Sequence, residues 1–157
     1  MGKYRYLFVF TLPILAIISF YQEGALAYLP VFEAFVFIPL MELAFKPVAE
    51  NLTHEGKLAV QQDGFYLFAL RATVPVQWFC GFLLLYQCQG DLDTTTWVGR
   101  ILSYGMMCGV IGINVAHELG HKQNKLDQFL AKALLTSTLY THFFLEHNFG
   151  HHKNVGT

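Results

Sequence analysis

Charged residues are scarce in this sequence. They make up 13% of its 157 residues, whereas 54% of the residues are hydrophobic. A soluble domain usually carries about 25% charged residues. The shortfall argues against an ordinary soluble domain and predicts a protein embedded in membrane lipid. The length predicts a single domain.

The sequence also lacks a basic run and a cysteine framework. The formal net charge is −1, so nucleic acid is not an expected partner. The three cysteines, Cys80, Cys88 and Cys108, all lie in apolar segments. An odd number of cysteines without regular spacing argues against a disulfide scaffold. We expect these thiols to be buried as small hydrophobic groups.

What the sequence does contain is long apolar runs, which predict four membrane-spanning helices. A bilayer requires about 20 apolar residues per helix. The four runs cover residues 6–22, 28–45, 65–88 and 98–116. We expect the first two to form a tight hairpin that turns near Glu23 and Gly24. The first run also resembles a signal peptide, but apolar residues resume directly after its cleavage-like Ala25-Leu26-Ala27.

Two carboxylates interrupt the second run. A carboxylate inside a membrane is costly unless it is paired or lies near the interface. We expect Glu42 to lie at the interface and Glu33 to face the interior of the bundle, and we assign Glu33 no chemistry. The fourth run is rich in glycine, which permits close helix packing.

The distribution of Lys and Arg predicts the orientation of the bundle. The loops around residues 22–24 and 89–97 contain no basic residue. By the positive-inside rule, the opposite side is cytoplasmic and carries the N-terminus and the histidine clusters. The basic residues on that side are Lys3, Arg5, Lys46, Lys57, Lys122, Lys125, Lys132 and Lys153.

The segment 126–146 is nearly long enough to form a fifth span. A crossing there would place the two histidine clusters on opposite faces, roughly 30 Å apart. Asp127 and Lys132 also make the segment less apolar than the other runs. We therefore predict a helix at the cytoplasmic interface. The alternative is a fifth span with two unrelated histidine clusters.

Five of the seven histidines fall in two clusters near the end of the sequence: His117, His121, His147, His151 and His152. A spacing of four residues stacks two side chains on one helix face, with Cβ atoms about 5–6 Å apart. Such imidazoles can hold metal ions. We predict that these clusters bind metal.

The identity of the metal is less constrained by the pattern. His117-Glu118-Leu-Gly-His121 also matches the H-E-x-x-H motif of zinc proteases, in which Glu118 would be the general base. However, a catalytic zinc takes three protein ligands, and Gly120 is a poor helix former. Two iron ions suit a larger set of imidazoles and can activate dioxygen. We favour an oxygen-dependent enzyme for a lipid-soluble substrate over a zinc protease or a membrane metal carrier.

The two clusters resemble the first two histidine boxes of the integral-membrane alkane 1-monooxygenases. The matching segments are His117-Glu-Leu-Gly-His121-Lys122 and Glu146-His147-Asn-Phe-Gly-His151-His152. This family belongs to a membrane di-iron group with the fatty-acid desaturases and xylene monooxygenase. Lys122 and the form of the second box favour the alkane hydroxylases, and a desaturase or xylene-type hydroxylase remains the alternative.

The resemblance implies an all-α, polytopic transmembrane bundle with a cytoplasmic-side histidine-rich metal site. It implies oxygen-dependent terminal hydroxylation of n-alkanes to 1-alkanols at two non-haem iron ions (Fe). Rubredoxin, reduced by a nicotinamide-dependent reductase, would supply the electrons. The expected location is a bacterial inner membrane, whose lipid would also deliver the alkane.

The resemblance also assigns roles to residues. His117, His121, His147, His151 and His152 match the positions of iron ligands. His142, Glu118 and Glu146 are candidates for orienting these ligands, and a purely structural role is equally expected for each. The family has a third histidine box further along its sequence. Residues 1–157 are therefore expected to be one membrane domain, a C-terminally truncated part of a longer enzyme that is inactive alone.

Overall fold

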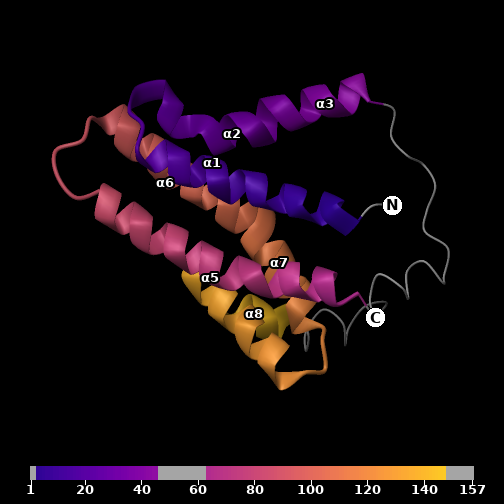
Figure 1. The fold of residues 1–157 in the computed structure, drawn as a ribbon. Helices are drawn as coiled ribbons and strands as arrows, with labels where there is room; N and C mark the ends of the chain where they lie inside the picture. Colours follow the sequence, from indigo (N-terminus) through magenta and orange to yellow (C-terminus); the bar gives the residue numbers. More distant parts are fainter. Residues whose placement is uncertain (1–2, 46–62, 148–157) are drawn as a thin grey trace.

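The computed structural model describes residues 3–45 and 63–147. All regular structure in these two ranges is helical, which confirms the predicted all-α class (Figure 1). Three helical runs are long and apolar enough to cross a membrane: Gly24–Ala44, Gly64–Gln87 (α5) and Thr94–Gly120. They correspond to the second, third and fourth predicted spans. The polytopic helical architecture is therefore confirmed.

The apolar part of the N-terminal helix, Tyr6–Phe20, contains fewer residues than the predicted span over 6–22 and is not among the three candidate spans. A 3-10 helix, η1 (Lys3–Phe10), leads into α1 (Thr11–Phe20). A 3-10 helix rises about 2.0 Å per residue and an α-helix about 1.5 Å, so the two together extend roughly 31 Å. The hydrocarbon core of a bilayer is about 30 Å thick. The 3-10 geometry of η1 thus lengthens the whole helix, Lys3–Phe20, to about the thickness of the hydrocarbon core.

The first two helical runs form the predicted hairpin. The second run consists of η2 (Gly24–Tyr28), α2 (Leu29–Phe32), the π-turn η3 (Glu33–Phe37) and α3 (Ile38–Ala44). Gly24 has a φ of +58°, a conformation that glycine adopts without steric cost, so the turn falls at the predicted position. α2 packs beside α1 and α6 (Figure 1).

The last long run bends through a π-turn just before the histidines. It comprises α6 (Thr94–Met107), η4 (Cys108–Gly112) and α7 (Ile113–Gly120). It is longer than the predicted 98–116, because the Asp93 side chain caps its start and the helix continues through His117. A Cβ atom on Gly99 would lie 2.6 Å from the ring of Tyr28. The predicted close packing of this glycine-rich helix is confirmed.

The segment 126–146 does not form a fifth span. α8 (Lys125–Ser137) has 13 residues and extends about 20 Å, too short for a bilayer. The chain then turns at Leu139, which has a φ of +56°, and forms the single turn α9 (Phe143–Leu145). α8 packs against α7 and α5 (Figure 1). Its placement at the membrane interface stays a prediction.

The core lies between α1, α5, α6, α7 and α8 and is apolar. Phe20, Met107 and Leu119 are among its fully buried side chains. Cys80 and Cys108 are buried as predicted, whereas Cys88 is half-buried. The outer faces are apolar too, as shown by Phe35 and others on the second run. A helix with apolar residues on all sides is typical of a membrane span. Glu33 is buried and Glu42 exposed, in agreement with their predicted positions.

The end of the bundle opposite the histidines is held by polar contacts. The Arg100 guanidinium donates to the Gln87 carbonyl oxygen at 2.6 Å and to the Gln22 carbonyl oxygen at 3.1 Å. These carbonyls lie at or just after the C-terminal ends of α5 and α1, where the helix dipole favours a positive charge. Arg100 therefore ties three helices together.

A second contact at this end links the hairpin turn to the start of α6. The buried Thr96 hydroxyl accepts a hydrogen bond from the Gly24 N–H at 2.8 Å and donates one to the Asp93 carboxylate. The Thr96 N–H also donates to Asp93. These hydrogen bonds, led by that of the Thr96 hydroxyl, lower the pKa of the Asp93 carboxyl.

We expect Thr96→Val to destabilise the fold by about 1 kcal/mol, because the Gly24 N–H loses its acceptor. When folding lowers the pKa of a carboxyl group, that group stabilises the fold at pH values above its unfolded-state pKa. This stabilisation is lost as the pH falls through the folded-state pKa, which for Asp93 means below roughly pH 4. Thr96→Val should therefore reduce the loss of stability in acid. Thermal unfolding in detergent at pH 7 and pH 3 measures both effects, and an unchanged acid dependence would contradict the assignment.

Candidate metal centre

Three of the five predicted ligands meet at one end of the bundle. His117 lies in the last turn of α7, His121 directly follows α7, and His147 follows α9. The Nε2 atom of His121 lies 3.0 Å from that of His117 and 3.2 Å from that of His147. One ring nitrogen from each residue lies within 4.8 Å of the others. The structure thus unites histidines from both sequence clusters. His151 and His152 lie outside the described residues.

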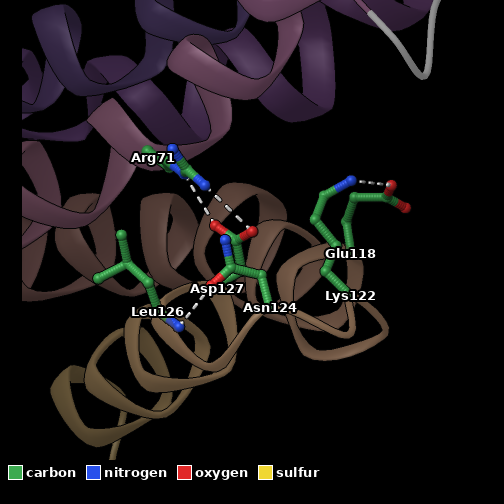
Figure 2. Close-up of polar contacts among 6 residues, drawn as sticks. All are labelled: Arg71, Glu118, Lys122, Asn124, Leu126 and Asp127. Carbon is green, nitrogen blue, oxygen red and sulfur yellow. Dashed lines mark hydrogen bonds and ion pairs between the residues drawn. The ribbon is translucent and has the colours of Figure 1, made fainter.

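Local helix geometry places the first pair. The His121 N–H donates to the His117 carbonyl oxygen at 3.2 Å, so the helical turn continues through both residues. Their rings consequently lie on one face and meet edge to face, with centroids 4.4 Å apart. After His121 the chain turns, and the Asn124 side chain caps α8 by accepting from the Leu126 N–H at 2.9 Å (Figure 2).

Aromatic packing places the third histidine. The Phe143 ring stacks on the His147 ring, with centroids 5.0 Å apart and an interplanar angle of 18°. Phe143 also stacks on Tyr140 and lies 6.3 Å from the His117 ring. This aromatic stack fixes the plane of the His147 imidazole beside the α7 pair. Because His117 and His147 are half-buried and His121 is exposed, the centre is open on one side.

The nitrogen separations fit a shared metal ion. Metal–nitrogen bonds of about 2.1 Å, with angles of roughly 90–110° between them, place neighbouring nitrogens about 3.0–3.4 Å apart. The two separations at His121 fall in this range. Imidazole is a good ligand for both iron and zinc. These residues are therefore a suitable donor set for a transition metal.

The two acidic candidates for orienting the ligands, Glu118 and Glu146, are not part of the group of histidines that converge among the described residues. The Glu118 carboxylate pairs with the Lys122 ammonium at 3.8 Å, on the helix that carries His117 (Figure 2). In the described part of the chain, the group of converging metal-binding side chains consists of the three histidines and does not include Glu118 or Glu146. His142 is exposed, and its ring packs against Tyr140 with centroids 4.6 Å apart. The proposed orienting roles of these three residues remain predictions.

An ion pair that sequence reasoning did not identify joins α5 to α8. The Arg71 guanidinium donates to both carboxylate oxygens of Asp127, at 2.8 Å and 3.2 Å (Figure 2). The Asp127 side chain is 3% exposed and lies in the first turn of α8, where the helix dipole favours a negative charge. The available signal was the lone charge of Arg71 in the apolar segment 65–88 and the acidic Asp127 in the segment 126–146, since charges in a membrane tend to pair.

Two further polar contacts hold α8 on α5. The Trp78 indole N–H donates to the Ala133 carbonyl oxygen at 3.1 Å, and the Gln77 amide donates to the Ser137 hydroxyl at 2.7 Å. Together with Arg71 and Asp127, these contacts run along much of α8. α8 links His121 to the segment that bears His147. The contacts between α5 and α8 therefore help to position the metal centre.

A small apolar cavity of about 120 Å³ lies between η1, α5 and α7. Tyr6, Tyr66, Leu70 and Val115 are among its lining residues, and the Tyr6 and Tyr66 rings meet edge to face at 5.1 Å. Val115 precedes His117 by two residues on α7. The cavity therefore offers space for an apolar group on the helix that carries the histidine pair.

The fold and the site define a helical membrane protein with a three-histidine centre suited to a metal. Curated proteins similar in sequence are alkane 1-monooxygenases. The chain is 32% identical over 125 residues to that of Acinetobacter baylyi and 36% identical over 125 residues to alkane 1-monooxygenase 1 of Pseudomonas aeruginosa. These alignments cover 78% and 76% of this chain. The resemblance to the alkane 1-monooxygenases is thus confirmed, and the chain is their relative in sequence.

The similarity concerns part of each relative. Alkane 1-monooxygenase 2 of Pseudomonas aeruginosa is 37% identical over 105 residues, which is 62% of this chain and 26% of that protein. The first two alignments cover 30% and 32% of the relatives. The chain therefore spans about a third of the length of the curated relatives it matches. No family model matches the chain.

Proposed function

We propose that this chain is the part of an alkane 1-monooxygenase that carries its first two histidine boxes. The reaction is oxygen-dependent hydroxylation of the terminal carbon of an n-alkane to give a 1-alkanol. The observation that supports this proposal best is the convergence of His117, His121 and His147 from two separate sequence motifs. The names of the curated relatives supply the reaction and the substrate class.

His117, His121 and His147, joined by His151 and His152, would hold two non-haem iron ions. Bound iron would supply the activation of dioxygen. The residues of the chain orient and shield this chemistry. Phe143 fixes the plane of the His147 ring, and the apolar cavity beside Val115 binds the end of an alkyl chain and excludes water. The substrate needs no polar anchor there, since an alkane has no polar group.

We further propose that the remaining iron ligands lie beyond Thr157 and that residues 1–157 alone are inactive. The relatives are about three times as long as the aligned region, which supports this proposal. The two electrons would come from rubredoxin and its reductase. We propose that the centre lies on the cytoplasmic side of a bacterial inner membrane. Lys122 and Lys125 lie near the histidines in the sequence, and by the positive-inside rule they support the cytoplasmic side.

The zinc protease interpretation receives less support. A general base must lie within hydrogen-bond reach of the water that it activates. Glu118 instead pairs with Lys122, and the converging groups of the described residues are histidines.

The proposed function is tested by isotope incorporation. The protein with the coding sequence that follows Thr157 is supplied with rubredoxin, its reductase, a reduced nicotinamide cofactor, n-octane and ¹⁸O₂. We expect 1-octanol that contains ¹⁸O, detected by mass spectrometry. An alkene product would indicate a desaturase, and 1-octanol without the label would contradict a monooxygenase.

A further inference from the structure

A buried carboxyl group lies beside an apolar cavity away from the histidine centre. Glu33 is 5% exposed, and its Oε2 atom has no hydrogen-bond partner among the residues that the structure describes. The adjoining cavity, between α1 and the second helical run, has a volume of about 480 Å³. Sites for small molecules commonly measure about 300–1,000 Å³. One oxygen of the Glu33 carboxyl group is thus without a partner among the described residues, beside a cavity of ligand size.

The π-turn η3 (Glu33–Phe37) marks this position in the helix. The Ile38 N–H bonds to the Glu33 carbonyl oxygen, five residues back, where an α-helix would use the residue four back. Single π-turns inside α-helices are frequent at functional sites. The neighbouring Phe32 and Phe35 are 57% and 68% exposed, whereas Glu33 is turned inward. The helix therefore holds the carboxyl group on its buried side, in the lining of the cavity to which residues of α1 also contribute.

The remaining lining of the cavity is almost entirely apolar. It includes Phe8, Ile14, Leu15, Leu29, Phe32 and Phe37. The one hydroxyl in the lining belongs to Thr11, and it donates to the Phe8 carbonyl oxygen at 2.8 Å. A carboxyl group left without a hydrogen bond in such surroundings costs free energy. The matching ligand has an apolar chain and one group that can hydrogen-bond.

We propose that this cavity binds a single-chain primary alcohol from the bilayer. The hydroxyl hydrogen-bonds to the Glu33 carboxyl group, and the alkyl chain packs on the phenylalanine and leucine side chains. An alkane of the same length would leave Glu33 unpaired. Sites built to hydrogen-bond a hydroxyl reject analogues that lack it. The identity of the alcohol as the 1-alkanol product rests on the proposed function, and the cavity would then separate product from substrate.

The test uses two photoactivatable probes with the protein, produced with the coding sequence that follows Thr157, in lipid nanodiscs. One probe is a long-chain primary alcohol with a diazirine in mid-chain, and the other has a methyl group in place of the hydroxyl. We expect the alcohol to label residues 8–15 and 29–37 at least fivefold more strongly, with competition by 1-dodecanol and none by dodecane. Equal labelling by both probes, or labels elsewhere, would overturn the proposal and indicate non-specific contact with acyl chains.

Variants at position 33 test whether the hydroxyl group of the alcohol probe binds to Glu33. Glu33→Leu should abolish the preference for the alcohol, whereas Glu33→Gln should keep it, because an amide also donates and accepts hydrogen bonds. Glu42→Leu, which removes an exposed carboxyl on α3, is the matched control and should behave like the wild type. A preference that survives Glu33→Leu would refute the role of Glu33. If a variant fails to fold, the comparison of the two probes on the wild type still decides the proposal.

Binding in this assay requires neither metal nor turnover. The absence of labelled octanol from the ¹⁸O₂ experiment would refute the hydroxylase function and leave the alcohol site standing. Equal labelling by the two probes would refute the alcohol site and leave the hydroxylase function standing. The two proposals can therefore fail separately.

Discussion

His147→Ala should abolish alkanol formation and reduce bound metal by more than about tenfold, since even residues that merely orient ligands change metal affinity 10–100-fold. Within the part of the chain that the structure describes, His147 is the histidine of the second box that lies at the centre. Without it, His117 and His121 would remain as two ligands from a single helix. The protein should still insert and fold, because His147 is half-buried at the end of the described chain.

The matched control for this variant is His142→Ala. His142 lies five residues earlier, is exposed and packs on Tyr140. Because His142 is not among the converging histidines of the described chain, this variant should retain the metal, and a loss of about 10–100-fold would instead show that His142 orients a ligand. Metal content is measured by mass spectrometry on the purified protein, and 1-octanol is measured by gas chromatography. Near-full activity in His147→Ala would remove His147 from the centre.

Arg71→Met should cause the largest loss of stability among the substitutions considered in the bundle. It leaves the Asp127 carboxylate, 3% exposed, without its partner. Removing one partner of a buried ion pair typically costs about 3–5 kcal/mol, because the remaining charge is buried and unpaired. Asp127→Asn should cost less, since Arg71 is 33% exposed and can reach solvent. The double variant Arg71→Met/Asp127→Leu should recover much of the stability.

Thermal unfolding in detergent checks this order. The control is Glu118→Gln, which breaks a more exposed pair with a separation of 3.8 Å and should change stability by less than about 1 kcal/mol. Arg71→Met should also weaken metal binding, because α8 links His121 to the segment that bears His147. If the double variant were as unstable as Arg71→Met, the account of an unpaired buried charge would be wrong.

The sequence predicted the helical spans well because hydropathy determines which segments enter a bilayer. Glu33 was correctly placed in the interior, and the turn at Gly24 followed from the polar break between two apolar runs. The stretched geometry of η1 was not predictable, since residues 3–10 have no pattern that distinguishes a 3-10 helix from an α-helix. The π-turns at Glu33 and Cys108 were likewise missed.

The candidate centre was predictable in composition and only partly in geometry. The spacing of His117 and His121 places them on one helix face, and the rejection of a fifth span correctly brought His147 to the same end. The pairing of Arg71 with Asp127 and the stack of Phe143 on His147 depend on how α5, α8 and α9 pack. No local pattern records such packing. The proposed role of Glu33 in binding an alcohol depends on the cavity between α1 and the second helical run, which no local sequence pattern predicts.

The identity of the bound metal tests the central claim most directly. The protein, produced with the coding sequence that follows Thr157 in medium containing both iron and zinc, is purified and its metals are counted. We predict two iron ions per chain, with Mössbauer spectra of non-haem iron, and loss of both in His117→Ala. One tightly bound zinc ion and no iron would contradict the account and favour a zinc enzyme built on the same histidines.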